Sequence, residues 1–246
     1  MEEQFPTKTT DPVGQGTLEL FADTDNFNKW LFDSLEPFCK DNLLEIGSGI
    51  GNISALLIDR FKEVTLSDLR ETYCSILRRK FEQQTHLKEV IQFDLSEMEI
   101  QKKYPHLVNR FDTIIASNVV EHIEQDNRAI QNCSTLLKPG GRLVVLLPAY
   151  AFLYNNFDRE LRHYRRYHKG SLKNVFEKEG FRVIHTQYFN AAGILGWWFS
   201  GSVLKKKMIP KDQLRIYDKL IPVIRMADSL LMHRAGLSVI AVGEKK

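Results

Sequence analysis

The sequence has few cysteines and no strong excess of charge of either sign. Its 246 residues include three cysteines, Cys39, Cys74 and Cys133, which lie far apart and form no C-x-x-C pair. This spacing excludes a local zinc knuckle and a disulfide framework, so we expect no metal site and a reducing, cytoplasmic environment. The formal net charge of +3 is too small to indicate nucleic acid as a partner.

The chain also lacks internal repeats, low-complexity tracts and an apolar targeting segment near its first residue. Residues 1–16 are acidic and then polar, which predicts a flexible N-terminus and no signal peptide. The rest, 17–246, is predicted to form one domain, because this length and a hydrophobic content of 43% are enough for a sizeable core.

Short β-like runs alternate with helical ones through most of this domain. An amphipathic helix is predicted over 26–37, where apolar residues recur at helical spacing. Strands are predicted at Leu43–Ile46, Glu63–Ser67, Lys88–Gln92, Asp112–Ser117, Arg142–Leu147, Arg182–Tyr188 and Ser238–Gly243, and helices at Ile53–Phe61, Glu71–Gln84, Gln125–Leu137 and Ser171–Glu179. This order predicts an α/β protein with a doubly wound, mostly parallel sheet covered on both faces.

Residues 189–236 interrupt this alternation with two apolar helical patterns, which predict a helical lid insertion over the ligand edge of the sheet. No Asp, Glu, Lys or Arg occurs between Val183 and Leu204, and three lysines follow at 205–207. One interpretation is a buried lid helix over an apolar acceptor. The other is an interfacial helix with Trp197 and its neighbours among lipid headgroups, which would make the protein membrane-peripheral. Pro222 is expected to kink or divide the second pattern.

The stretch LLEIGSGIGNIS, 43–54, leads from the first predicted strand into a glycine-rich turn. Ligands of open α/β sheets bind beyond the carboxyl ends of the strands, so this turn belongs to the predicted site. A dehydrogenase fingerprint would place glycine at position 52, which is Asn52, and a Walker loop would need Gly-Lys-Ser/Thr. Neither pattern is present.

Polar side chains also end the following strands. Asp68 comes after the second strand, where a carboxylate accepts hydrogen bonds from both hydroxyls of a ribose. Asp94 follows the third strand, where its side chain or the Leu95 amide reaches an adenine edge, and Asn118 ends the fourth. Each acid alone is typical of a helix cap or a solvated charge. Together, at the ends of consecutive strands, they predict an adenosine site.

These motifs are E-x-G-x-G-x-G, the acid after the second strand, F-D-L, N-V-V-E-H and L-K-P-G-G. In this order they resemble the class I S-adenosylmethionine (SAM) dependent methyltransferases, over residues 17–188 and again in the last strand. The resemblance implies a Rossmann-like, seven-stranded sheet with one antiparallel strand, SAM as cofactor and S-adenosylhomocysteine as product. The cofactor-binding residues that it implies are Glu45, Gly47, Ser48, Gly49, Gly51, Asp68, Leu69, Asp94, Leu95, Asn118 and Val119.

The acceptor side is predicted from the segment 154–173, which follows the fifth strand and alternates arginine, histidine and tyrosine. Its D-R-x-x-x-H-Y-R-R-Y run resembles a signature in one branch of these methyltransferases. The arginines favour an anionic group on the acceptor; the alternative is a solvated helix with tyrosines packed inward. The predicted substrate-binding residues are Tyr154, Arg159, Tyr164, Arg165, Arg166 and Trp197.

Transfer from a sulfonium is an in-line displacement that needs alignment and a dry pocket, and a base only where the acceptor must lose a proton. His122, after the fourth strand, and His163 are the candidate catalytic residues. Another interpretation of His122 is that it orients its loop or meets the carboxylate of the cofactor.

We therefore expect a methyltransferase acting on a small, partly apolar acceptor with an anionic or polar handle. The alternatives are a SAM-binding enzyme that uses the sulfonium without methyl transfer, a non-catalytic SAM-binding partner subunit, and a nucleotide-dependent oxidoreductase.

Overall fold

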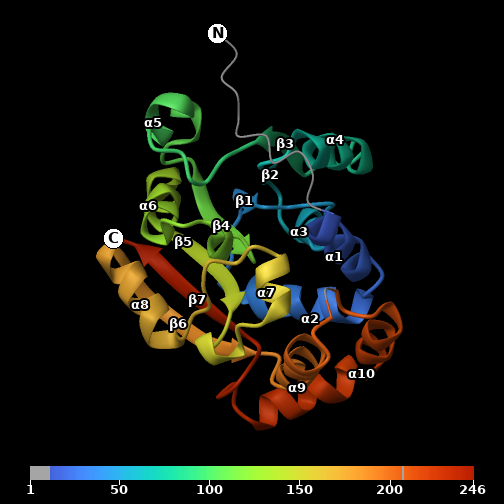
Figure 1. Cartoon of the computed structure of the whole chain (residues 1–246). Coiled ribbons are helices and arrows are strands. Elements are labelled where there is room, and N and C mark those ends of the chain that lie inside the picture. The colour runs from blue at the N-terminus through green and yellow to red at the C-terminus, as the bar shows by residue number, and fades with distance from the viewer. Residues whose placement is uncertain (1–11, 207) are drawn as a thin grey trace.

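The computed structural model describes residues 12–206 and 208–246 (Figure 1). Within them a seven-stranded sheet has the order β3-β2-β1-β4-β5-β7-β6. The strands are β1 Leu43–Ile46, β2 Val64–Asp68, β3 Leu87–Gln92, β4 Phe111–Ser117, β5 Leu137–Pro148, β6 Phe181–Phe189 and β7 Ser238–Lys245. β7 pairs antiparallel with both neighbours and the other pairings are parallel. The predicted fold class is confirmed.

Helices cover both faces of this sheet (Figure 1). They are α1 Pro12–Ala22, α2 Asp25–Leu35, α3 Ser54–Arg60, α4 Glu71–Lys80, α5 Ile100–Lys103, α6 Asp126–Leu136, α7 Asn156–Glu160, α8 Lys169–Lys178, α9 Gly193–Trp198 and α10 Lys211–Leu230. None of the described helices is both long enough and apolar enough to cross a membrane.

Two apolar clusters hold the helices to the sheet, one on each face. Adjacent residues of β1 divide between them: Leu44 packs with α5, α6 and α8, whereas Leu43 packs with α2, α3, α4 and α10. All four residues of β1 are buried. A central strand covered on both faces is apolar throughout rather than alternating, which is why LLEI reads as a continuous buried run apart from Glu45.

The structure differs from the sequence predictions in three elements. Residues 12–22 form α1, although 1–16 were expected to be flexible; residues 1–11 of that segment lie outside the described residues. β5 begins at Leu137, five residues before the predicted strand at Arg142, and so includes the glycine pair Gly140–Gly141 in a stretch where its pairing with β4 is irregular. Pro222 does not divide the second apolar pattern, because α10 continues through it as one helix of 20 residues.

The insertion between β6 and β7 contains α9, a π-helical turn at Phe199–Val203, and α10. Buried acids fix it in place. The Asp228 carboxylate accepts the backbone N–H groups of Asn190 and Ala191 at 2.9 and 2.7 Å, which holds the chain where it leaves β6. The Asp218 carboxylate accepts the Phe27 N–H at 2.8 Å and thereby ties α10 to α2.

Candidate active site

A cleft of about 1120 Å3 opens at the carboxyl ends of the central strands. β1 lies between β2 and β4 in the sheet, so the chain crosses to the other side of β1 after β3. This reversal of strand order is where open α/β sheets bind ligands. Ile46, Asp68 and Ser117 belong to the floor of the cleft, Leu18 of α1 and Trp197 of α9 to its walls. The volume is ample for a nucleoside-sized ligand together with a small second molecule.

The glycine turn after β1 is built for close approach. Gly47 and Gly49 have positive φ of 73° and 56°, the left-handed region that favours glycine. A Cβ on Gly47 would meet the Val119 side chain at 2.5 Å, and one on Gly49 would meet Leu18 at 2.9 Å. Gly47, Ser48 and Gly49 line the cleft. Gly51 does not; its Cβ would meet Phe81, so this glycine serves the packing of the turn against α4.

Two buried acids support this turn. The Asp68 carboxylate accepts the Gly49 N–H at 3.0 Å with one oxygen and the Arg70 N–H at 2.9 Å with the other. Burial raises the pKa of Asp68, and these two backbone donors oppose the shift. Burial likewise raises the pKa of Glu45 to about 7, against a hydrogen bond from the Ser54 hydroxyl at 2.5 Å.

The other residues implied for the cofactor reach the same cleft. Leu69, Asp94, Leu95, Asn118 and Val119 all line it, beyond the ends of β2, β3 and β4. The Asp94 carboxylate accepts the Ser96 N–H at 2.8 Å and so caps its own turn. This is the capping role that is typical of an acid considered alone. These residues therefore lie together at one edge of the sheet, and their role in cofactor binding stays a prediction.

On the acceptor side the structure divides the predicted residues. Tyr164, Arg166 and Trp197 line the cleft, whereas Tyr154, Arg159 and Arg165 do not. Arg165 instead pairs outside the cleft with Asp126 at 3.0 Å. The segment after α7 is not helical, so spacing along the sequence does not give the direction of its side chains.

Arg166 is a buried structural group rather than a free cation. Its Nε donates to Asp158 at 2.8 Å, its Nη1 donates to the Ala149 carbonyl at 2.9 Å, and its guanidinium lies 4.8 Å from the Trp197 ring centre. Burial pushes the pKa of Asp158 upward, but hydrogen bonds and charge from His163 and Arg166 hold it below its usual value. Arg166 therefore supports the wall of the cleft.

Both candidate catalytic histidines lie at the cleft, with their ring centres 4.7 Å apart and nearly perpendicular. His122 is exposed there. His163 is buried, and its Nδ1 lies 2.9 Å from an Asp158 oxygen. Beside them Glu121 is fully buried, and burial raises the pKa of its carboxyl to about 7.

Sequence reasoning missed several residues of the cleft. Gly14, Thr17, Leu18 and Phe21 come from α1; Gly14 was placed in the flexible N-terminus because 1–16 are acidic and then polar, and the other three were given no role in the site. Arg128 of α6 and Arg162 also line the cleft. Arg162 has φ of 60°, and this left-handed backbone turns it away from the direction of Arg159. No sequence pattern signals such a turn at an arginine.

Charged side chains of both signs line the cleft. Glu45 and Asp68 belong to the carboxyl-terminal parts of β1 and β2 and Asp94 follows β3, while Arg128 comes from α6 and Arg162 from the segment after α7; Arg70 and Glu124 line the cleft as well. Carboxylates suit the hydroxyls and amines of a nucleoside ligand, and arginines suit an anionic group.

Comparison with known proteins gives a consistent class. Residues 44–143 match the family described as "Methyltransferase domain". The ubiquinone biosynthesis O-methyltransferase of Coxiella burnetii is 32% identical over 102 residues, 42% of this chain and 41% of that protein. The chain thus matches about two fifths of the length of this curated relative.

Solved methyltransferases share the fold. Phosphoethanolamine N-methyltransferase 2 of Haemonchus contortus, in complex with phosphomonomethylethanolamine and S-adenosylhomocysteine, superimposes with a TM-score of 0.63 at 17% identity, covering 97% of this chain and 58% of that one. A SAM-dependent methyltransferase of Archaeoglobus fulgidus gives a TM-score of 0.61 at 19% identity, covering 92% and 97%.

The fold is therefore the Rossmann-like fold of SAM-dependent methyltransferases. Together with the matched methyltransferase domain, it supports a class I SAM-dependent methyltransferase with SAM as cofactor.

Proposed function

We propose that the chain transfers a methyl group from SAM to a small, partly apolar acceptor that carries an anionic or polar handle. The observation that carries this proposal is one cleft that brings Glu45, Asp68 and Asp94, near the ends of β1, β2 and β3, together with arginines, histidines and aromatic rings from α6, α9 and the segment after α7. The names of two similar proteins support an acceptor of this kind: one is an O-methyltransferase of ubiquinone biosynthesis, and the other was solved with phosphomonomethylethanolamine.

The residues on the nucleoside side fit SAM. A side chain at Gly47 or Gly49 would collide with Val119 or Leu18, so this turn stays small where it lines the cleft and leaves that space to a ligand. Each Asp68 oxygen accepts one backbone N–H and keeps further acceptor capacity for ribose hydroxyls. When bound, SAM supplies an activated methyl group on a positively charged sulfur.

The chain's own residues then have separate tasks. Asp68 and the glycine turn bind and orient the nucleoside, and the apolar side chains of the insertion, among them Trp197 and Leu214, exclude water. Arg162, rather than Arg165, is the proposed contact for the acceptor handle, because it lines the cleft. His122 and His163 are the proposed catalytic residues beside the acceptor.

The first test is mass spectrometry of the small molecules released when the freshly purified full chain is denatured. We expect SAM or S-adenosylhomocysteine, followed by transfer of labelled methyl from SAM to members of a panel of alkylated phenols and amino-alcohol phosphates. SAM consumption without a methylated product would point to sulfonium chemistry without transfer. Binding with turnover only after a second protein is added would point to a partner subunit, and binding of NAD(P) alone to an oxidoreductase.

We also propose that the insertion makes a peripheral contact with an anionic lipid surface. Ile216, Leu220, Val223 and Leu230 recur at helical spacing on α10 and are between 50% and 77% exposed. Leu195 of α9 is 73% exposed. Lys205, Lys206 and Lys219 in the same insertion supply positive charge, and Lys207 lies outside the described residues. This contact would bring the cleft close to an apolar acceptor held in a membrane.

A further inference from the structure

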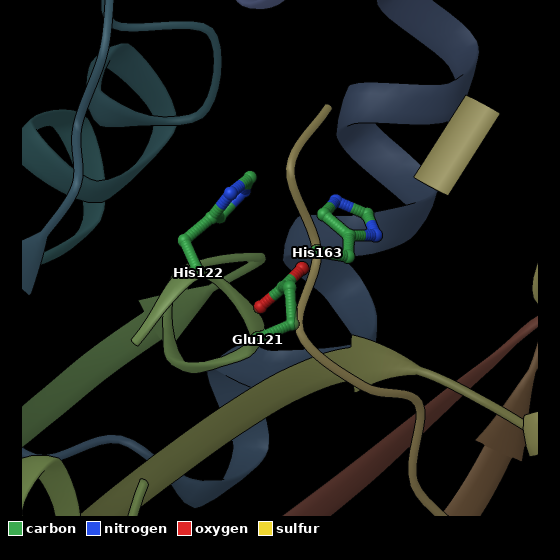
Figure 2. A group of neighbouring side chains, drawn as sticks. All are labelled: Glu121, His122 and His163. Atoms are coloured by element: carbon green, nitrogen blue, oxygen red, sulfur yellow. The ribbon is translucent and has the colours of Figure 1, made fainter. Parts of the chain in front are cut away.

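Three potential metal ligands meet at the acceptor side of the cleft. Glu121, His122 and His163 each offer one ligand atom, and these atoms lie within 4.8 Å of one another. Figure 2 shows the Glu121 carboxylate between the two imidazole rings, with His122 on one side and His163 on the other. Glu121 and His122 come from the short turn after β4, and His163 from the segment after α7.

Glu121 is the unusual member of this group. Its side chain is fully buried, and neither carboxylate oxygen has a hydrogen-bond partner among the described residues. A buried carboxylate that makes no hydrogen bond is costly and rare in proteins, so each instance calls for a ligand, an ion or a proton to account for it. The two histidines beside it are the groups with which carboxylates share divalent metals.

The ring of His163 is oriented by a carboxylate, as the rings of metal-binding histidines commonly are. Its Nδ1 lies 2.9 Å from an oxygen of Asp158, and that carboxylate is itself fixed by the Arg166 Nε at 2.8 Å and the Asn155 N–H at 2.9 Å. A carboxylate that accepts from one ring nitrogen fixes the ring and leaves the other nitrogen with its lone pair. Asp158 is thus placed to orient His163 as a ligand.

We propose that Glu121, His122 and His163 bind a divalent transition-metal ion of the kind that two histidines and one carboxylate select, such as Zn2+. Zinc–nitrogen bonds of about 2.1 Å bring tetrahedral ligand atoms to about 3.4 Å from one another. The exposed side chain of His122 supplies the movement that this contraction needs. Because His122 and His163 line the cleft, an ion held between them would be open to the cleft for a further ligand.

A metal ion at this site would add a second requirement for the acceptor, besides the anionic or polar handle. A bound ion would hold an oxygen of the acceptor and would lower the pKa of a hydroxyl there, so that the hydroxyl could release its proton to water before the oxygen takes the methyl group. This preference rests on the proposed function, and it narrows the expected acceptors to those with a hydroxyl or carboxylate oxygen. His122 and His163 then act as ligands rather than as bases.

The test is a titration of the chelator-treated full chain with ZnCl2 by isothermal calorimetry, supported by the visible absorption of the Co2+ form. We expect one ion per chain, and at least about tenfold weaker binding for both Glu121→Gln and His122→Gln. His106→Gln, an exposed histidine away from the cleft, is the matched control and should bind as the unchanged chain does. No binding by the unchanged chain, or equal binding by all variants, would overturn the proposal.

Two further measurements keep the outcome clear. Thermal melts of Glu121→Gln report on folding; if that buried variant does not fold, the exposed His122→Gln decides alone. Binding of SAM is measured separately on the chelator-treated chain. If the chain binds SAM but no metal, the metal site is overturned and the proposed function stands. If the chain binds the metal but no SAM, the proposed function is overturned and the metal site stands.

Discussion

The Asp68 carboxylate accepts the Gly49 backbone N–H at 3.0 Å, joining the end of β2 to the glycine turn after β1. One side chain therefore both shapes the turn and faces the nucleoside half of the cleft. Its two oxygens are engaged by Gly49 and by the Arg70 N–H at 2.9 Å, so a neutral replacement weakens charge-assisted bonds on both sides.

We expect Asp68→Asn to bind SAM about ten- to a hundredfold more weakly, the equivalent of roughly 1.5–3 kcal/mol for a hydrogen bond to a charged group. Calorimetric titration with SAM measures this. The control is Asp59→Asn on the exposed side of α3, which should bind as the unchanged chain does. Equal affinity in Asp68→Asn and in the unchanged chain would remove Asp68 from the cofactor site.

A second prediction separates two arginines of one short segment. Arg162 lines the cleft, whereas Arg159, three residues earlier, is exposed elsewhere. We expect Arg162→Gln to raise the KM for the methyl acceptor about tenfold with SAM affinity unchanged, because one charge-assisted contact to the handle is lost. Arg159→Gln is the matched control. Initial rates at varied acceptor concentration give both values, and an effect of Arg159→Gln alone would reverse the assignment.

Ordered motifs made the cofactor side predictable from the sequence. Asp68 ends β2, Glu45 lies one residue before the end of β1, and Asp94 and Asn118 closely follow β3 and β4. Parallel strands bring these carboxyl ends to one edge of the sheet whatever the helices between them do.

The acceptor side depends on the direction of individual side chains in irregular backbone, which sequence spacing does not encode. Arg165 and Arg166 are adjacent in sequence, yet Arg165 pairs with Asp126 outside the cleft and Arg166 is buried against Asp158. The wall built from α1 escaped prediction for a related reason. Leu18 packs over Gly49, a contact between segments that share no motif.

A third prediction concerns the pH dependence of stability. The pKa of Glu45 rises from 4.5 to about 7 on folding because the carboxyl is buried. An acid with a raised pKa in the folded state disfavours folding progressively as the pH increases from about 4.5 to about 7, a cost of roughly 3 kcal/mol for such a shift. Above neutral pH, the charged Glu45 carboxylate therefore lowers the stability of the folded chain without ligand.

We expect Glu45→Gln to melt several degrees above the unchanged chain at pH 8, with the difference shrinking towards pH 5. The amide oxygen of glutamine still accepts the Ser54 hydroxyl, so the local hydrogen bond is kept. Thermal melts followed by circular dichroism at the two pH values measure the difference. A variant less stable than the unchanged chain at pH 8 would show that the charge of Glu45 is compensated.

The last prediction tests the proposed contact of the insertion with lipid. Leu220 and Val223 lie in the exposed apolar stripe of α10, so replacing both with serine removes apolar surface without disturbing the core. We expect the unchanged chain to sediment with vesicles that contain phosphatidylserine more than with phosphatidylcholine alone, and the double variant Leu220→Ser, Val223→Ser to lose most of this binding.

Ile76→Ser is the control for that experiment, because Ile76 is 44% exposed on α4, outside both the insertion and the cleft lining. Its vesicle binding should match that of the unchanged chain. Added salt should weaken the binding of the unchanged chain, since Lys205 and Lys219 act through charge. Equal sedimentation with both kinds of vesicle, or equal loss in Ile76→Ser and the double variant, would mean that the exposed stripe of α10 does not contact an anionic membrane.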